Sequence, residues 1–241
     1  MSSVIIASIS RSSIFFVGAV LHIKIYCCRL QGKRNLIFSE LIIIFFVRQE
    51  ICPVVEVYEL GNIYVLEIGE YKMKNLIFIN GTMGVGKTAT SRELQKLLLN
   101  CVYLDGDWCW DMSPFIVNDE TKNMVIDNIS HLLNNFISCS VYENIIFCWV
   151  MHEESIIDDV LSRLEKRDYK LYKFSLVCSE QALISRITKD IKMGIRTEDV
   201  INKSISRLKN YFLMDTYKID VSNISAQEAA EIIFKHIMHK S

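Results

Sequence analysis

The sequence predicts an α/β fold of three layers, in which a five-stranded parallel sheet lies between helices on both of its faces. Two observations predict this fold. From residue 73 onward, apolar runs of strand length alternate with stretches of helical periodicity, which is the pattern of parallel strands joined by crossover helices. Five such strands and their connections occupy about 170 residues, the size of one compact domain. We therefore predict one domain over residues 73–241.

Each element of this domain follows from its own pattern. The predicted strands are apolar runs at residues 75–80, 101–104, 144–150, 171–178 and 217–221. Apolar residues at core-facing spacing predict helices at residues 87–99, 121–137, 155–166, 180–193, 198–212 and 226–239. Ser225 and Glu228 have the spacing of a capping box at the start of the last helix. Gly194 and Arg196 fall in the gap between the fourth and fifth helices, which predicts a short lid there.

The composition excludes several classes of protein. The chain has 27 Lys+Arg against 28 Asp+Glu, whereas a nucleic-acid binder shows a basic surplus, so we expect no nucleic-acid partner. Two prolines and nine glycines in a chain that is 51% hydrophobic exclude a disordered or collagen-like protein. The eight cysteines include no C-x-x-C pair and no spacing that suits zinc, so we expect reduced thiols in a cytoplasmic protein.

The first 72 residues differ from the rest of the chain. They contain no aspartate, and their apolar residues occur in clumps with neither a helical nor a strand period. The apolar runs at 14–21 and 41–47 are shorter than the roughly 20 residues of a membrane-spanning helix, and the first lacks a cleavage region typical of secretion. We therefore expect no membrane association, and we describe residues 1–72 as a poorly organised N-terminal extension.

A hypothesis about translation explains this change of character. The codons of Gly69 and Glu70 can spell a ribosome-binding sequence at a suitable distance before Met73. We therefore expect Met73 to be the physiological start and residues 1–72 to be upstream sequence read in frame. A loose accessory segment is the alternative.

A glycine-rich loop carries the strongest functional signal. It fits G-x-x-x-x-G-K-[ST] at every defined position and lies between a predicted strand and a predicted helix, the context that confirms this motif. Its glycines let backbone N–H groups converge on a phosphate chain at the positive end of the following helix. The Lys87 ammonium then reaches the β- and γ-phosphates, and the Thr88 hydroxyl ligates Mg²⁺. This predicts a P-loop NTPase fold whose nucleotide-binding residues are Gly81, Thr82, Met83, Gly84, Val85, Gly86, Lys87 and Thr88.

Two carboxylates follow the second predicted strand. Asp105 and Asp107 are separated by a single glycine at the end of this strand, and ligands of parallel sheets bind beyond the carboxyl ends of the strands. One carboxylate can orient or deprotonate an acceptor hydroxyl, while the other, for which Asp107 is a candidate, holds Mg²⁺ through a bound water. A solvated acidic turn or a helix cap is the structural alternative.

Together these motifs resemble small P-loop kinases. The loop followed by Leu104-Asp105-Gly106-Asp107 is similar to the gluconate kinase and adenylylsulfate kinase type, and to the nucleoside-monophosphate-kinase-like group that includes shikimate kinase and chloramphenicol phosphotransferase, which have an AAA-type ATP-binding domain. The resemblance covers residues 74–237. It implies that Arg186 or Arg196 closes over the phosphates and neutralises charge during transfer, which suits a planar guanidinium. From the residues alone, an ion pair between Arg186 and Asp190, four residues on, is nearly as well supported.

Two departures from the family pattern concern the metal and the acceptor. Residues 151–154, after the third strand, lack the usual aspartate, so Asp105, Asp107, Glu153 or a water has to substitute for it as a partner of Mg²⁺. The histidine and proline that follow the turn in gluconate kinases are replaced by Trp110 and, further on, Pro114, which puts gluconate in doubt.

Several other side chains have both a functional and a structural interpretation. His152 is either a substrate contact or a structural residue, and Lys122 either holds an anionic substrate or lies on a solvated helix face. Four aromatic residues either line a pocket for a ring-bearing or sugar-like acceptor or fill the core beside the sheet. They are Trp108, Trp110, Phe115 and Trp149.

These observations predict a kinase that moves the γ-phosphate of Mg·ATP to a small hydroxylated or phosphorylated metabolite. The expected catalytic residues are Lys87, Asp105, Asp107, Arg186 and Arg196. The expected partners are ATP and the acceptor, with the protein acting as a monomer or homodimer. A binding or ATPase switch module without an acceptor is the main alternative. A polynucleotide 5′-hydroxyl kinase is disfavoured by the balanced charge, and a membrane-tethered form depends entirely on residues 1–72.

Overall fold

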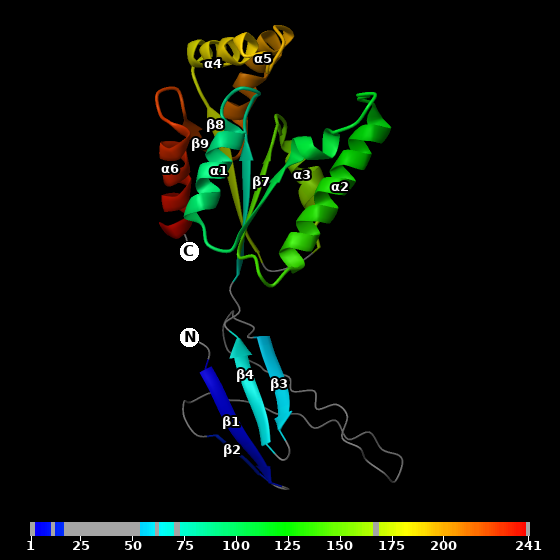
Figure 1. Ribbon diagram of the computed structural model, residues 1–241, viewed down its shortest axis with the longest axis vertical. Helices are drawn as coiled ribbons and strands as arrows, with labels where there is room; N and C mark the ends of the chain where they lie inside the picture. Colours follow the sequence, from blue (N-terminus) through cyan, green and yellow to red (C-terminus); the bar gives the residue numbers. More distant parts are fainter. Residues whose placement is uncertain are drawn as a thin grey trace. The chain divides into compact units, whose positions relative to one another are not determined.

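The computed structural model of the chain describes residues 3–10, 13–16, 54–60, 63–69, 73–165 and 169–239 (Figure 1). Contacts between residues divide the chain into two units, Met1–Lys72 and Met73–Ser241. No helix in the described part of the chain is both long enough and apolar enough to cross a bilayer. The apolar run predicted at 41–47 and the end of the helix predicted at 155–166 lie outside the described residues.

The strands of the N-terminal unit form an antiparallel sheet. Strands β1 and β2 pair directly with each other, β1 also pairs with β4, and β4 pairs with β3, giving the order β2-β1-β4-β3. The expectation that translation begins at Met73 stays a prediction, which mass spectrometry of the native N-terminus tests. The bounds are β1 (Ser3–Ser10), β2 (Ser13–Phe16), β3 (Val54–Leu60) and β4 (Ile63–Gly69).

The C-terminal unit alternates strands and helices. Its five strands are β5 (Lys74–Asn80), β6 (Cys101–Asp105), β7 (Asn144–Trp149), β8 (Tyr169–Val177) and β9 (Tyr217–Asp220). Its helices are α1 (Lys87–Leu97), α2 (Asp119–Ser138), α3 (Glu154–Ser162), α4 (Glu180–Lys192), α5 (Asp199–Leu213) and α6 (Ala226–His239), with a short 3-10 helix η1 (Gly106–Trp110) after β6.

All five strands run parallel in the order β6-β7-β5-β8-β9, with β5 at the centre. Successive residues of β5 point to opposite faces of the sheet. Ile77 and Ile79 belong to a buried cluster with residues of α1 and α6, and Leu76 and Phe78 to a second one with residues of α2 and α3. Figure 1 shows α1 and α6 on one side of the sheet and α2 and α3 on the other. The predicted three-layer α/β fold is therefore confirmed.

Local signals explain where some elements begin. Ser225 and Glu228 form the predicted capping box, because the Glu228 carboxylate accepts from the Ser225 N–H at 2.8 Å and the Ser225 hydroxyl accepts from the Glu228 N–H at 3.2 Å. Helix η1 was not predicted. It begins where the Asp105 carboxylate accepts from the Asp107 N–H at 3.1 Å, so a side chain caps its first turn.

The register of the sheet brings three strand ends together. Asn80 at the end of β5 pairs with Trp149 of β7, and Asp105 at the end of β6 pairs with Cys148 of β7. Because the strands are parallel, the phosphate loop after β5 and the Asp105-Gly106-Asp107 turn after β6 emerge at the same edge of the sheet.

Candidate active site

The phosphate loop joins β5 to the first turn of α1. Gly84 has a φ of +80°, a conformation that residues with a side chain rarely adopt, and a Cβ placed there would lie 2.6 Å from Cγ1 of Ile187. The buried Thr82 hydroxyl donates to the carbonyl of Ser204 in α5 at 2.8 Å. The loop is therefore held against both α4 and α5.

Lys87 points back over the loop that precedes it. Its Nζ donates to the carbonyl of Thr82 at 3.0 Å. Burial lowers the pKa of the Lys87 ammonium, whereas the carboxylates of Asp107 and Asp105 act to raise it. A desolvated ammonium inside a loop of backbone donors is suited to bind a phosphate chain, because the phosphate replaces the solvation that burial removes.

Asp105 is the centre of a small hydrogen-bond network. Its Oδ2 accepts from the Thr88 hydroxyl at 3.1 Å and from the Tyr103 hydroxyl at 2.8 Å. The guanidinium of Arg92 in turn stacks over the Tyr103 ring, 4.1 Å from its centroid. Burial raises the pKa of Tyr103, with contributions from Cys148 and from the bond to Asp105, so this hydroxyl remains a donor. Asp105 thus fixes the position of the Thr88 oxygen.

Asp107 occupies a different environment from Asp105. It is exposed toward a cavity, yet the surrounding protein reduces its solvation and raises the pKa of its carboxyl, and the neighbouring Asp105 carboxylate raises it further. The charge of Lys87 and a hydrogen bond from the Trp149 side chain act in the opposite direction. Of the two carboxylates, Asp107 is the exposed one and Asp105 is buried.

The two arginines implied by the family resemblance are placed differently. Arg186 donates to the backbone carbonyl of Val85 in the loop at 3.0 Å and to the carbonyl of Val221 after β9. Arg196, in the connection between α4 and α5, pairs with Asp190 at 3.0 Å. Its charge adds to the lowering of the Lys87 pKa and partly opposes the rise in the pKa of Asp107. Arg196 therefore lies near Lys87 and Asp107, and Asp190 pairs with Arg196 rather than with Arg186.

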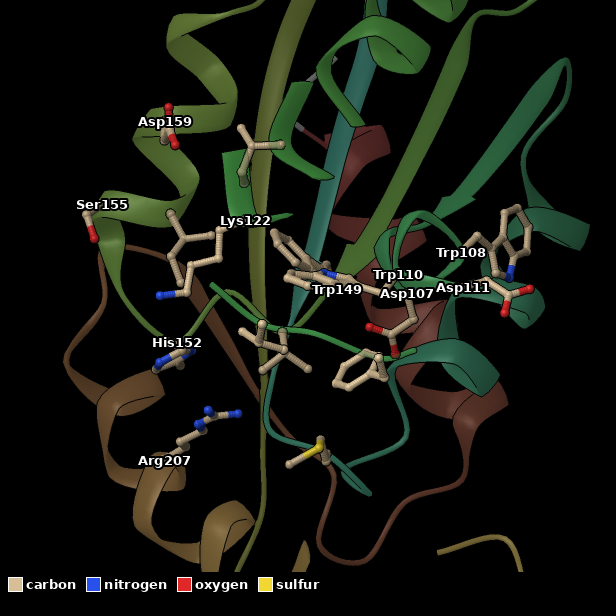
Figure 2. A pocket seen from close by; sticks show the side chains of 16 residues that line it. Asp107, Trp108, Trp110, Asp111, Lys122, Trp149, His152, Ser155, Asp159 and Arg207 are labelled. Carbon is tan, nitrogen blue, oxygen red and sulfur yellow. The ribbon is translucent and has the colours of Figure 1, made fainter. Parts of the chain in front are cut away.

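A cavity of about 1030 Å³ opens beside the loop and the acidic turn. Met83 of the loop and Asp107 both line it, so the predicted phosphate site and the cavity are continuous. Figure 2 shows Trp149 and Trp110 beside Asp107, well separated from His152 and Arg207. The lining residues are Met83, Asp107, Trp108, Trp110, Asp111, Phe115, Val117, Lys122, Ile126, Trp149, Val150, His152, Ser155, Ile156, Asp159 and Arg207.

Trp149 explains the glycine between the two carboxylates. A Cβ placed on Gly106 would lie 2.4 Å from Cγ of the Trp149 indole, closer than any real contact. The indole therefore packs directly against the backbone of the acidic turn. Trp149 is both a wall of the cavity and the support of the acidic turn, and its contact with an acceptor stays a prediction.

The far end of the cavity is cationic. Arg207 of α5 is half-buried and has no hydrogen-bond or ion-pair partner among the residues that the structure describes. Partial burial lowers the pKa of His152, and the charge of Arg207 lowers it further, so this histidine is neutral at physiological pH. His152 Nδ1 is buried without a partner in the described part of the chain.

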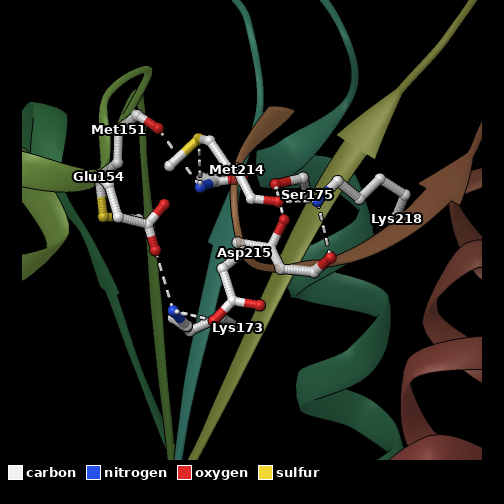
Figure 3. Close-up of polar contacts among 9 residues, drawn as sticks. Met151, Glu154, Lys173, Ser175, Met214, Asp215 and Lys218 are labelled. Atoms are coloured by element: carbon white, nitrogen blue, oxygen red, sulfur yellow. Dashed lines mark hydrogen bonds and ion pairs between the residues drawn. The ribbon is translucent and has the colours of Figure 1, made fainter. Parts of the chain in front are cut away.

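The acidic residues after β7 are engaged elsewhere. Glu154 binds Lys173 of β8 at 3.0 Å, and Lys173 also contacts Asp215 at 3.4 Å (Figure 3). Glu153 lies 3.6 Å from His152. Cys148 of β7 lies near Lys87, and burial raises the pKa of its thiol. The carboxylates near the loop are thus Asp105 and Asp107.

A known protein family matches the part of the chain that contains the candidate site. Residues 77–207, just over half of the chain, match the family described as AAA domain. The chain belongs to the AAA domain family. The match begins in β5 and ends at Arg207, so it includes the loop, the acidic turn and both predicted arginines.

Solved structures resemble this AAA domain in fold. A sugar kinase from Janibacter sp. HTCC2649 is 12% identical, with a TM-score of 0.51 over 68% of this chain and 94% of that one. A gluconokinase from Sinorhizobium meliloti 1021 is 14% identical, with a TM-score of 0.50 over 70% and 99%. A shikimate kinase from Acinetobacter baumannii, in complex with shikimate, is 20% identical, with a TM-score of 0.50 over 71% and 97%. The predicted resemblance to small P-loop kinases is therefore confirmed at the level of fold. No curated protein matches the chain in sequence.

Sequence reasoning missed several residues of the candidate site, among them Tyr103 and Arg207. Arg207 lies inside a helix that was predicted, but the prediction did not say which part of this AAA domain the helix covers. A signal was present in the spacing, because Arg207 and the buried Tyr211 lie four residues apart and so share one face of α5.

Proposed function

We propose that this AAA domain is a phosphotransferase that moves the γ-phosphate of Mg·ATP to a hydroxyl group of a small-molecule acceptor. One observation carries the proposal: the phosphate loop and Asp107 border a single cavity of about 1030 Å³. Hydrolysis requires room for only a water molecule, whereas transfer requires a pocket in which an acceptor lies next to the nucleotide. We infer that the protein catalyses this reaction in the cytoplasm.

The proposed mechanism assigns binding to the loop. The backbone of residues 82–88 and the Lys87 ammonium hold the triphosphate. The Thr88 hydroxyl is exposed and is oriented by Asp105 at 3.1 Å, so an oxygen donor that suits Mg²⁺ stands at the start of α1. Thr88 would hold the ion, with Asp105 and Asp107 placed to bind its waters. When bound, Mg²⁺ neutralises charge on the β- and γ-phosphates.

The acidic turn activates the acceptor in this proposal. The acceptor oxygen attacks the γ-phosphorus, and the bond between that phosphorus and the β,γ-bridging oxygen breaks, so ADP leaves. The proton of the acceptor hydroxyl passes to the Asp107 carboxylate. Arg196 neutralises charge that develops on the transferred phosphoryl group, after exchanging Asp190 for phosphate oxygens. Arg186 supports the loop from behind through the Val85 carbonyl.

The test is ADP formation by the full chain with Mg·ATP, in the presence and absence of a panel of alcohols, sugars, nucleosides and phosphorylated metabolites. We expect acceptor-dependent ADP formation that is lost in Lys87→Ala and retained in Lys96→Ala, a lysine on the exposed face of the same helix. ADP formation at the same rate with and without every acceptor would contradict the proposal.

A second candidate is a nucleotide-dependent switch without an acceptor. The observation that favours it is that residues 151–154, after β7, lack the aspartate that these kinases usually carry there. This candidate predicts tight ATP binding together with slow ADP formation that no acceptor stimulates.

A further inference from the structure

The tryptophans of this chain are concentrated at one place. The sequence contains three tryptophans, and all three line the cavity beside Asp107. Trp108 and Trp110 come from η1 and Trp149 from β7, so two separate segments supply them. Tryptophan offers the largest apolar surface of any side chain, with one polar N–H. Their gathering around one cavity indicates that its occupant has extensive apolar surface.

The walls nearest Asp107 are aromatic on more than one side. The indole of Trp149 is held against Gly106, and the ring of Phe115 lies 5.9 Å from that of Trp110, at 49°. Phe115 is 67% exposed, and its neighbours Ile116 and Val117 are 48% and 54% exposed. Phe115 and Val117 line the cavity. Apolar side chains that stay in water at the rim of a cavity mark a place where an apolar ligand binds.

The size and the apolar walls of the cavity favour an occupant that is larger and more apolar than a small polyol. Pockets of about 300–1,000 Å³ hold drug-sized ligands, and this one is slightly larger, with about 1030 Å³. A polyol also requires many unengaged hydrogen-bonding groups. Asp159 is bound to Arg163 at 3.0 Å and Lys122 to Asp119 at 3.4 Å. Figure 2 shows His152 and Arg207 well away from Asp107.

We propose that the acceptor is a drug-sized alcohol built on an aromatic or fused-ring body, which packs against Trp149, Trp110 and Phe115 while its hydroxyl reaches Asp107. Only the transfer of the phosphoryl group to this alcohol rests on the proposed function. The ring-binding site itself does not depend on transfer. The transferred group replaces the hydroxyl proton, which passes to Asp107, and ADP is the second product.

The probe is hydroxymethylanthracene, a fused-ring primary alcohol, and gluconate and shikimate are the polyol comparison. Anthracene absorbs where tryptophan emits, so binding beside the three tryptophans quenches their fluorescence and sensitises that of the probe. The experiment uses the full chain, with and without Mg·ATP, and the reaction mixtures are analysed by mass spectrometry for phosphorylated alcohol. Fluorescence reports binding and mass spectrometry reports transfer, so the two claims are measured separately.

Two exposed phenylalanines provide a matched pair of variants. Phe115 lines the cavity, whereas Phe212 is 54% exposed on α5 and does not line it. We expect Phe115→Ser to bind the probe about tenfold more weakly, because it loses one aromatic contact, and Phe212→Ser to bind it as the original chain does. Trp110→Leu provides a second variant with the same expectation. ATP affinity reports whether each variant is folded.

The outcomes separate the two proposals. Saturable quenching that weakens in Phe115→Ser and Trp110→Leu but not in Phe212→Ser supports the ring-binding site, whether or not the probe is phosphorylated. Such binding without phosphorylation of any bound alcohol would count against the phosphotransferase alone. Phosphorylation of gluconate or shikimate without saturable binding of the probe would overturn the ring-binding site and leave the phosphotransferase intact. Equal quenching in all three variants would overturn it as well.

Discussion

The two ends of the candidate site are built in different ways. At the proposed nucleotide end, the binding groups are the backbone of eight consecutive loop residues, with Lys87 as the main side chain. At the acceptor end, the cavity is lined by side chains from η1, the segment after it, α2, β7, α3 and α5. One end therefore depends on main-chain conformation and the other on how distant elements pack. This difference predicts that substitutions at the two ends affect different kinetic constants.

The largest effect is expected at the nucleotide end, for Lys87→Ala. Removing a charge that is aimed at the transferred phosphate costs about a thousandfold in kcat. Acceptor binding, measured by tryptophan fluorescence, should remain, because Lys87 does not line the cavity. The control is Lys96→Ala on the same helix. A Lys87→Ala protein with more than a tenth of the original kcat would contradict the assignment of the loop.

Asp107→Asn tests the point where the two ends meet. We expect kcat to fall about a hundredfold or more, since the variant cannot accept a proton. The pKa of Asp107 is higher in the folded protein than in the unfolded chain. Between these two pKa values the folded protein binds more protons at Asp107 than the unfolded chain does. The ionised carboxylate therefore makes the protein less stable as the pH rises through this range. Asp107→Asn should therefore unfold at a higher temperature than the original chain at neutral pH.

The same pKa shift sets the acid limb of the pH profile. Asp107 must be ionised to act as a base. As the pH is lowered, kcat/KM of the original chain should therefore begin to fall at a pH above the ordinary range of an aspartate, because the pKa of Asp107 is raised. Asp158→Asn, on the exposed side of α3, serves as the control for thermal unfolding. Equal unfolding temperatures for Asp107→Asn and Asp158→Asn would show that the ionised Asp107 carboxylate does not destabilise the folded protein.

Arg207→Gln affects only the acceptor end. The guanidinium has no partner among the described residues, so an acceptor that carries an anionic group is expected to bind about tenfold more weakly to the variant. The KM for ATP and the kcat for an uncharged alcohol should stay unchanged. Lys209→Gln, an exposed residue of the same helix, is the control. A matching rise in the KM for ATP would place Arg207 with the nucleotide instead.

The smallest effect is expected for Tyr103→Phe. This change removes the 2.8 Å hydrogen bond to Asp105 but leaves the bond from Thr88. Asp105 orients the Thr88 oxygen that would hold Mg²⁺. Losing the hydrogen bond from Tyr103 to Asp105 should therefore raise the Mg²⁺ concentration for half-maximal activity about fivefold. Tyr142→Phe, remote from Asp105, is the control. An unchanged Mg²⁺ requirement together with a lower stability would show that Tyr103 is purely structural.

The same contrast explains how much of the molecule could be predicted. The order of strands and helices follows from local periodicity, and the capping box at Ser225 and Glu228 follows from spacing within one turn. The loop around Lys87 is a linear motif between a strand and a helix, so the sequence contains both its residues and its context. The binding roles of these residues remain predictions.

The acceptor end could be predicted only in part. The aromatic residues could be named, but the sequence left open whether they line a pocket or fill the core. That choice depends on Gly106 and Trp149, which are more than forty residues apart and meet only in the folded sheet. The position of Arg207 depends in the same way on how α5 packs. Contacts between distant elements leave no pattern in a single sequence.

The fate of the γ-phosphate tests the central claim most directly. Phosphorus NMR of the full chain with Mg·ATP and a ring-bearing alcohol distinguishes a phosphate ester from inorganic phosphate in one sample. The account predicts that the ester appears in step with ADP and that both disappear in Lys87→Ala. Inorganic phosphate as the only new product, formed at the same rate without the alcohol, would contradict it and identify an ATPase.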